Sequence, residues 1–200
     1  KQGGDMNSRQ RMAAAMAMQE PDRVPVMCQL ALGHYFLNCG YAPHEIWFES
    51  EAFAAALVML QRRYRFDGIL VNIPGRPTDL LKEIAGIERK ADGEQITWRS
   101  GEITFCPWDD NPYHNDARGE PAAKADFATI DPDHLELVDD LPGYTWGVYH
   151  VPYLSQKAER GLLRSIPPYF LRTLDLVRAK AGEDVAVHGE VFSPFTHFLE

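Results

Sequence analysis

Apolar residues repeat along this chain with two different spacings, and these spacings predict helices and strands in turn. Three stretches carry apolar residues at helical spacing on one face: 9–19, 51–65 and 167–180. Three continuous apolar runs, of the kind found in buried parallel strands, each follow one of these helices: 24–30, 66–73 and 185–192. The repeated order of helix and strand predicts an α/β fold with a parallel sheet.

Capping residues mark the ends of these helices. Asn7 or Ser8 is a suitable cap for the first helix, which we expect to end near Glu20. Gly182 lies where the C-cap of the last helix belongs. A loop or broken helix is predicted at 33–43. A further short helix, which begins with Asp-Pro, is predicted at 131–141.

The spacing changes to alternation of apolar and polar residues over 87–106. Two turn dipeptides, Asp92-Gly93 and Ser100-Gly101, divide this stretch into short runs. The stretch therefore predicts an antiparallel β-meander inserted in the α/β scheme. Residues 109–124 are polar and have no hydrophobic period, and they predict a long loop or lid.

Composition limits the partners that this protein can have. The chain has 200 residues, of which 45% are hydrophobic, and this is enough for one globular domain with a sizeable core. A formal net charge of −9 disfavours nucleic acid or an anionic membrane surface as the main partner, because both would repel the chain. No apolar run reaches the roughly 20 residues that span a bilayer, and no secretory signal is recognisable. We therefore expect a cytoplasmic protein.

We expect a single domain over residues 1–200. Residues 1–5 precede Met6 and are either the remnant of a purification tag or native chain. The chain stops at Glu200, inside what should be the next helix, which predicts the N-terminal half, or somewhat more, of its domain. Three widely spaced cysteines fit neither a disulfide framework nor a paired zinc knuckle and are expected to be reduced and mostly buried: Cys28, Cys39 and Cys106.

Several short motifs resemble those of one enzyme superfamily. They are Asn-Ser-Arg-Gln-Arg at 7–11, Glu-Pro-Asp-Arg-Val-Pro-Val at 20–26, Phe-Asp-Gly-Ile-Leu at 66–70 and Phe-Ser-Pro-Phe-Thr at 192–196. In this order they resemble the uroporphyrinogen decarboxylase superfamily, which includes corrinoid-dependent methyltransferases. The resemblance implies a (β/α)₈ TIM barrel whose active site lies at the C-terminal ends of the strands.

The sequence departs from the true decarboxylases at three places. Those enzymes carry Arg-Gln-Ala-Gly-Arg-Tyr after the first strand, and its arginines pair with the carboxylates of the substrate. Residues 30–35 of this chain contain no arginine. Asn72 or Ile73 stands where the decarboxylases have an aspartate, and Glu200 where they have a tyrosine. The resemblance therefore implies a member that does not decarboxylate a polyanionic porphyrinogen.

If the chain forms such a barrel, the residues just beyond the C-terminal ends of its strands meet at one end of it, the barrel mouth. His188 and Glu190 are one residue apart in an extended segment, so they share a face and form the expected catalytic pair, able to act as acid and base or to bind a metal. The alternative is a buried, hydrogen-bonded polar pair. The residues expected to bind substrate are Gln29, His34, Asn72, Arg76, Ser193 and Glu200.

Structural alternatives exist for other polar residues as well. His34 has the alternative of a surface or packing residue. Arg76 can hold an anion at the barrel mouth or lie in a solvated loop. Asp67 precedes the second apolar run and is expected to be structural, paired with Arg62 or Arg65.

The leading functional hypothesis is methyl transfer between a corrinoid protein and a small acceptor such as a thiol or a folate. In the relatives zinc activates the acceptor, and the resemblance puts its ligands beyond Glu200. A decarboxylase acting on a porphyrinogen or another carboxylated small molecule is the alternative. A third hypothesis is a barrel without catalysis that serves as a corrinoid-binding or assembly partner. A homodimer is compatible with each of them.

Overall fold

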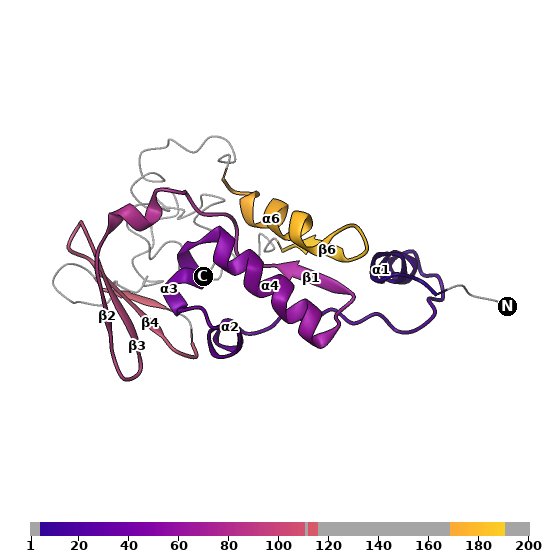
Figure 1. The fold of residues 1–200 in the computed structure, drawn as a ribbon, viewed down its shortest axis with the longest axis horizontal. Coiled ribbons are helices and arrows are strands. Elements are labelled where there is room, and N and C mark those ends of the chain that lie inside the picture. Colours follow the sequence, from indigo (N-terminus) through magenta and orange to yellow (C-terminus); the bar gives the residue numbers. More distant parts are fainter. Residues whose placement is uncertain (1–4, 111, 116–168, 191–200) are drawn as a thin grey trace, which may run out of the picture.

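The fold, seen in a computed structural model that describes residues 5–110, 112–115 and 169–190, is mixed α/β with two separate sheets (Figure 1). The parallel sheet pairs β1 with β6, and the antiparallel sheet has the order β2-β3-β4-β5. The strands are β1 (Gly68–Val71), β2 (Ile84–Arg89), β3 (Gly93–Trp98), β4 (Ile103–Pro107), β5 (Tyr113–Asn115) and β6 (Ala186–Gly189). Both the expected parallel pairing and the expected antiparallel meander are confirmed.

Helices pack around the parallel sheet and fill the space between the two sheets. They are α1 (Ser8–Met16), α2 (Leu32–Cys39), α3 (Pro43–Phe48), α4 (Ser50–Tyr64), the 3₁₀ helix η1 (Leu80–Glu83) and α6 (Arg172–Ala181). The helices α4 and α6 lie side by side, and each leads into the parallel strand that follows it (Figure 1). Arg172 on α6 forms an ion pair with Glu51 on α4, and Arg62 donates to the carbonyl of Lys180 at the other end of the helix pair.

The described core draws on several elements, and α4 contributes its buried face to it. Phe53, Leu57 and Leu60 are buried on the face that the sequence predicted, whereas Tyr64 is partly exposed. The meander contributes to the same cluster, since Trp98 of β3 packs edge to face on Phe48 of α3 with ring centroids 5.4 Å apart. The two sheets therefore share one hydrophobic core although no hydrogen-bonded ladder joins them.

The first apolar run differs from its prediction. Residues 24–30 form no strand but a segment beside β1, joined to it by one parallel bridge between Met27 and Gly68 and by a 2.6 Å hydrogen bond from Asp67 N to Val26 O. Val24 is 80% exposed, so the expected burial is wrong. Pro25 supplies no N–H to a ladder, and the N–H of Val26 is taken by the Asp67 side chain, so regular pairing does not develop.

Helix boundaries also differ from the predictions in two regions. The first helix ends at Met16, not near Glu20, because the chain turns at Met18, which has a left-handed φ of 57°. Its cap is Asn7, as expected, with a capping box to Gln10. The segment 33–43 is more helical than expected, since α2 runs up to the left-handed Gly40 and α3 begins soon after it.

Other boundaries follow the predictions with smaller shifts. The meander begins at Ile84, three residues earlier than expected. The expected loop at 109–124 contains β5, because residues 113–115 pair with β4. The C-cap of α6 is Gly182, as predicted. The helix expected at 131–141, the remainder of the 109–124 segment and residues 191–192 of the last expected strand lie outside the described residues.

A buried ionic network ties the N-terminal segment to β1. Asp67 is fully buried and accepts hydrogen bonds from Arg11 (2.6 Å), Arg23 (2.8 Å) and the Val26 N–H (2.8 Å), while Arg11 also pairs with Asp22. These residues belong to the motifs that carry the family resemblance. The structural role expected for Asp67 is confirmed, but its expected partners, Arg62 or Arg65, are wrong.

The cysteines are free thiols, as predicted. Cys39 and Cys106 are buried, and burial raises the pKa of both. Cys28 is exposed, in contrast to the expected burial, because it lies in the open segment beside β1. No helix in the described part of the chain is long and apolar enough to cross a bilayer.

Candidate functional site

Several of the predicted site residues lie on one face of the parallel sheet. Leu70 pairs with His188 in the register of β1 and β6, so their side chains point to the same side. Asn72 and Glu190 follow these two residues by two positions, and the hydrogen bond from Glu190 N to Val71 O (3.0 Å) continues the ladder. His188, Glu190 and Asn72 therefore share a face at the C-terminal ends of the strands.

Gln29 joins this group from the other side of β1. Its Nε2 donates to Oε2 of Glu190 at 3.1 Å, although 161 residues separate the two in the chain. The bridge between Met27 and Gly68 places residues 27–29 beside β1, opposite to β6. The hydrogen bond thus spans β1 and links the two segments that flank it.

The opposite face of the sheet is covered by helices. Ile69 and Val71, which alternate with Leu70 in β1, are buried in the core. Val187, which alternates with His188 in β6, lies beside Leu174 of α6 at a common cavity. His188 therefore points away from α6, and its Nε2 is buried without a hydrogen-bond partner among the described residues.

The Glu190 carboxylate has an altered acidity. Partial burial raises its pKa, and the hydrogen bond from Gln29 opposes this effect in part. A carboxyl group with a raised pKa exchanges protons closer to neutral pH than an ordinary glutamate does. Together with the imidazole of His188 on the same face, it provides two groups that can take up or release a proton at this edge.

Arg76 follows β1 but does not lie in an open mouth. Its side chain is 3% exposed, Nε donates to the Trp47 carbonyl at 2.8 Å, and its backbone N–H donates to Oγ of Ser50 at 2.8 Å. The guanidinium is therefore enclosed between α3 and the first turn of α4. This burial contradicts the solvated-loop alternative for Arg76, and its predicted contact with an anion stays a prediction.

His34 belongs to a contact between two helices. Its Nε2 lies 2.8 Å from the hydroxyl of Tyr64, at the end of α4, and Asn38 donates to its carbonyl. No described hydrogen bond connects His34 to Gln29 or Glu190. This contact agrees with the alternative role for His34, that of a surface or packing residue. The remaining predicted residues, Ser193 and Glu200, lie outside the described residues.

A second histidine and carboxylate pair has no signal in the sequence. Nδ1 of His44 lies 2.7 Å from Oε2 of Glu94, and the Glu94 side chain is buried. The two residues are 50 positions apart, one at the start of α3 and one in β3, so no local spacing could indicate the pair. The pair joins β3 of the meander to α3, away from the C-terminal ends of β1 and β6.

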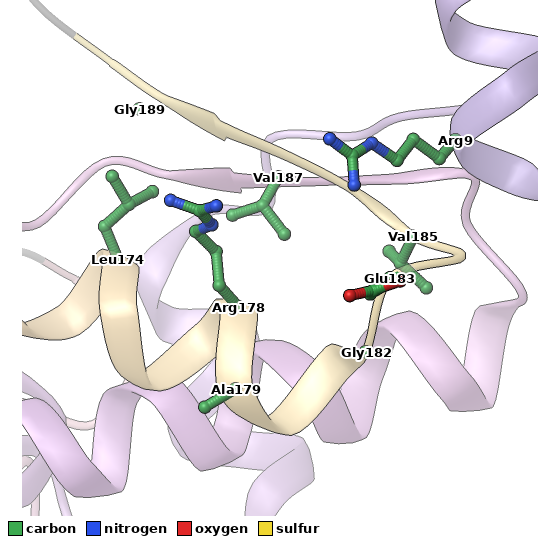
Figure 2. A pocket seen from close by; sticks show the side chains of 9 residues that line it. All are labelled: Arg9, Leu174, Arg178, Ala179, Gly182, Glu183, Val185, Val187 and Gly189. Carbon is green, nitrogen blue, oxygen red and sulfur yellow. The ribbon is translucent and has the colours of Figure 1, made fainter.

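A cavity of about 540 Å³ lies elsewhere, on the covered side of β6 (Figure 2). Arg9 of α1 and Arg178 of α6 extend toward Val187 there, and Glu183 lies near the turn after α6. Val187 points to the side of β6 opposite to His188. The cavity is consequently separate from the group formed by Gln29, Asn72, His188 and Glu190.

Metal binding has limited support from the described residues. Within 5–110, 112–115 and 169–190, no group of three or more His, Cys, Asp or Glu side chains could hold a metal ion. His188 and Glu190 provide two donors of the types that zinc prefers. Comparison of the chain with models of known families, with curated proteins and with solved structures produced no match.

Proposed function

We propose that this chain belongs to an enzyme of the uroporphyrinogen decarboxylase superfamily, with a (β/α)₈ barrel and a small-molecule site at the C-terminal ends of its strands. One observation carries the proposal: Gln29, His188 and Glu190 face the same side at those ends, with Gln29 bonded to Glu190. The order of the parallel segments, 24–30 then β1 then β6, is also the order of successive strands in such a barrel.

Methyl transfer from a corrinoid protein to a thiol or folate is the proposed reaction. A thiol must lose its proton when it accepts a methyl group, because the thiolate is the nucleophile. The bases that the described residues offer at this edge are the imidazole of His188 and the carboxylate of Glu190. The amide of Gln29 would hold the carboxylate in place, and Asn72 would contact the substrate.

Zinc would lower the pKa of a bound thiol acceptor. The described residues provide two donors at this edge, fewer than the three protein ligands of a catalytic zinc site. We therefore assign no step to zinc from these residues, and the ligands that the resemblance implies lie beyond Glu200. A small-molecule substrate, a corrinoid protein as partner and a cytoplasmic location are parts of the same proposal.

The first experiment is to measure the metal content and turnover of the full-length protein. We expect about one zinc per chain after purification without chelator, and methyl transfer from a methylated corrinoid to a thiol. His188→Ala and Glu190→Gln should each reduce turnover by roughly 10²–10⁴-fold, the range of general acid and base catalysis. Glu88→Gln, at an exposed carboxylate of β2, is the matched control and should retain activity.

The alternatives give different results in the same experiments. Micromolar affinity for a porphyrin carboxylate would favour the decarboxylase and contradict the argument from the missing arginines. If neither His188→Ala nor Glu190→Gln changes turnover, these two residues take no part in the proposed reaction. Corrinoid binding without any turnover would favour the barrel that serves only as a binding or assembly partner.

A further inference from the structure

The most unusual polar group among the described residues is the guanidinium of Arg76. Only 3% of this residue is exposed, and its Nη1 is buried without a hydrogen-bond partner in the part of the chain that the structure describes. Its Nε is bound to a carbonyl, that of Trp47. A guanidinium presents five N–H donors, so one neutral acceptor leaves most of this group unsatisfied.

The charge of Arg76 is not balanced by a carboxylate among the described residues. No described ion pair includes Arg76, and the nearby carboxylate of Glu51 is paired with Arg172. Burial lowers the pKa of Arg76 to about 10, but the group still carries its charge at neutral pH. A buried charge without a counter-ion is costly, and buried charges in proteins are normally paired.

Helix ends add to the positive character of the junction. Ser50, whose hydroxyl accepts from Arg76 N, is the first residue of α4, a 15-residue helix without a side-chain cap. The start of α6 lies against the same loop, since Gly75 N donates to Phe170 O at 2.7 Å. Helix N-termini carry unpaired N–H groups and a partial positive charge, which favour anions.

Two further donors at the junction have no acceptor among the described residues. They are Nε1 of Trp47, the residue whose carbonyl Arg76 contacts, and Oγ1 of Thr173, in the first turn of α6. Both side chains are buried to 98% or more. These two donors, like Nη1 of Arg76, are buried without an acceptor among the described residues.

We propose that the junction of α3, α4 and α6 around Arg76 is a binding site for an oxyanion, a carboxylate or phosphate group. The planar guanidinium and the helix N-terminus provide the charge and the donors that such a group accepts. This inference is independent of the proposed methyl transfer, because it rests on Arg76 and not on the strand-end residues. Since Nη1 is enclosed, binding requires a movement of the loop around Gly75, and exchange should be slow.

Thermal unfolding and anion titration test this site. Inorganic phosphate and acetate should raise the Tm of the protein in a saturable way, whereas chloride at equal ionic strength should not. Arg76→Met should weaken phosphate binding at least about tenfold, because a hydrogen bond to a charged group is lost. Arg178→Met, at the cavity of Figure 2, is the matched control and should leave the affinity unchanged.

Arg76→Lys guards against a failure of the methionine variant to fold. It keeps the charge but lacks the two-pronged geometry, so we expect a folded protein with weaker phosphate affinity than the wild type. Equal shifts of Tm by chloride and phosphate in the wild type would overturn the proposal. Equal phosphate affinity in the wild type and in Arg76→Lys would overturn it as well. If phosphate binding is lost only in Arg178→Met, binding belongs to the cavity of Figure 2 and the proposal fails.

Discussion

The hydrogen bond between Gln29 and Glu190 makes the acidity of one carboxyl group depend on a distant segment. Partial burial raises the pKa of Glu190, and the Gln29 amide opposes that shift. Gln29→Ala should therefore raise the pKa of Glu190 further, because the hydrogen bond that opposes the effect of burial is lost. Titration of the glutamate side-chain carbons by NMR measures this directly. An unchanged pKa would mean that the bond does not form in solution.

The sign of the pH effect follows from the same shift. Glu190 binds its proton more readily in the folded state than in the unfolded chain, because its folded pKa lies above the ordinary value. Its contribution to stability therefore increases as pH falls through that folded value. This behaviour is opposite to that of Asp67, whose carboxylate is stabilised as an anion.

Asp67 is the residue at which a single substitution should cost most. It is fully buried between two arginines, and its removal would leave the guanidinium of Arg11 without a buried partner. Asp67→Ala should lower the free energy of unfolding by about 3–5 kcal/mol. Urea unfolding checks the value, with Asp175→Ala, at an exposed aspartate of α6, as a control expected to lose less than about 1 kcal/mol.

The network around Asp67 also shows the limit of prediction for single residues. The position of Asp67 before an apolar run was enough to predict a structural role. Arg62 and Arg65 lie close to Asp67 in the sequence, yet the partners are Arg11 and Arg23, 56 and 44 residues away. Pairing over such separations depends on the packing of α1 against the sheet, which local spacing does not contain.

Among the elements, the start of β3 has little free space. A Cβ added to Gly93 would lie 2.7 Å from Cζ of Phe105 and also meet the carbonyl of Cys106. Gly93→Ala should therefore destabilise the protein by about 1–3 kcal/mol through overpacking. Gly86→Ala is the matched control in the same sheet, since a Cβ there meets nothing within 4 Å. Similar midpoints of urea unfolding for the two variants would contradict this packing.

Elements with a long, regular pattern were predicted well, and those that depend on partners were not. The helix over 51–65 and the meander over 87–106 have spacings that fix one buried face. The helix formed within one residue of the expected ends, and the meander began three residues early and gained the further strand β5. The run 24–30 has the composition of a buried strand. Its burial needs neighbours on both faces and both edges, and the composition of one segment cannot provide them.

For the whole molecule, the lowered carboxylate pKa values predict sensitivity to acid. Hydrogen bonds with arginines hold the pKa of Asp22 and of Glu51 below the usual values. For Asp67, burial raises the pKa, but the hydrogen bonds from the Val26 N–H and from the arginines outweigh this effect and lower it. These groups contribute stability above the unfolded values near 4, and that stability is lost as pH falls below them. Thermal unfolding followed between pH 7 and pH 3 should show a falling Tm below about pH 4.

A comparison with the Asp67→Ala variant separates the contribution of the Asp67 network to acid unfolding from the contribution of the other carboxylates. The variant lacks the most buried of these carboxylates, so its Tm should fall less steeply between pH 5 and pH 3. Parallel curves for variant and wild type would show that the Asp67 network does not control acid stability.

The candidate site could be predicted in part because it obeys a rule of the whole fold. Residues after parallel strands meet at one edge, and this brought together Gln29, Asn72, His188 and Glu190. The same rule does not state how a loop residue turns after leaving the strand. Arg76 turns back into the helical layer, where a carbonyl and a hydroxyl hold it, and His34 is held by Tyr64.

The central position of β1 has a consequence for hydrogen exchange. Within the described parallel sheet, β1 has a neighbour on each side, β6 along its length and Met27 at its first residue. The residues of β2, by contrast, lie at an outer edge and are largely exposed. Amide protons of β1 should therefore outlast those of β2 in heavy water, so slow deuterium uptake in β1 reports on the strand beneath the candidate site.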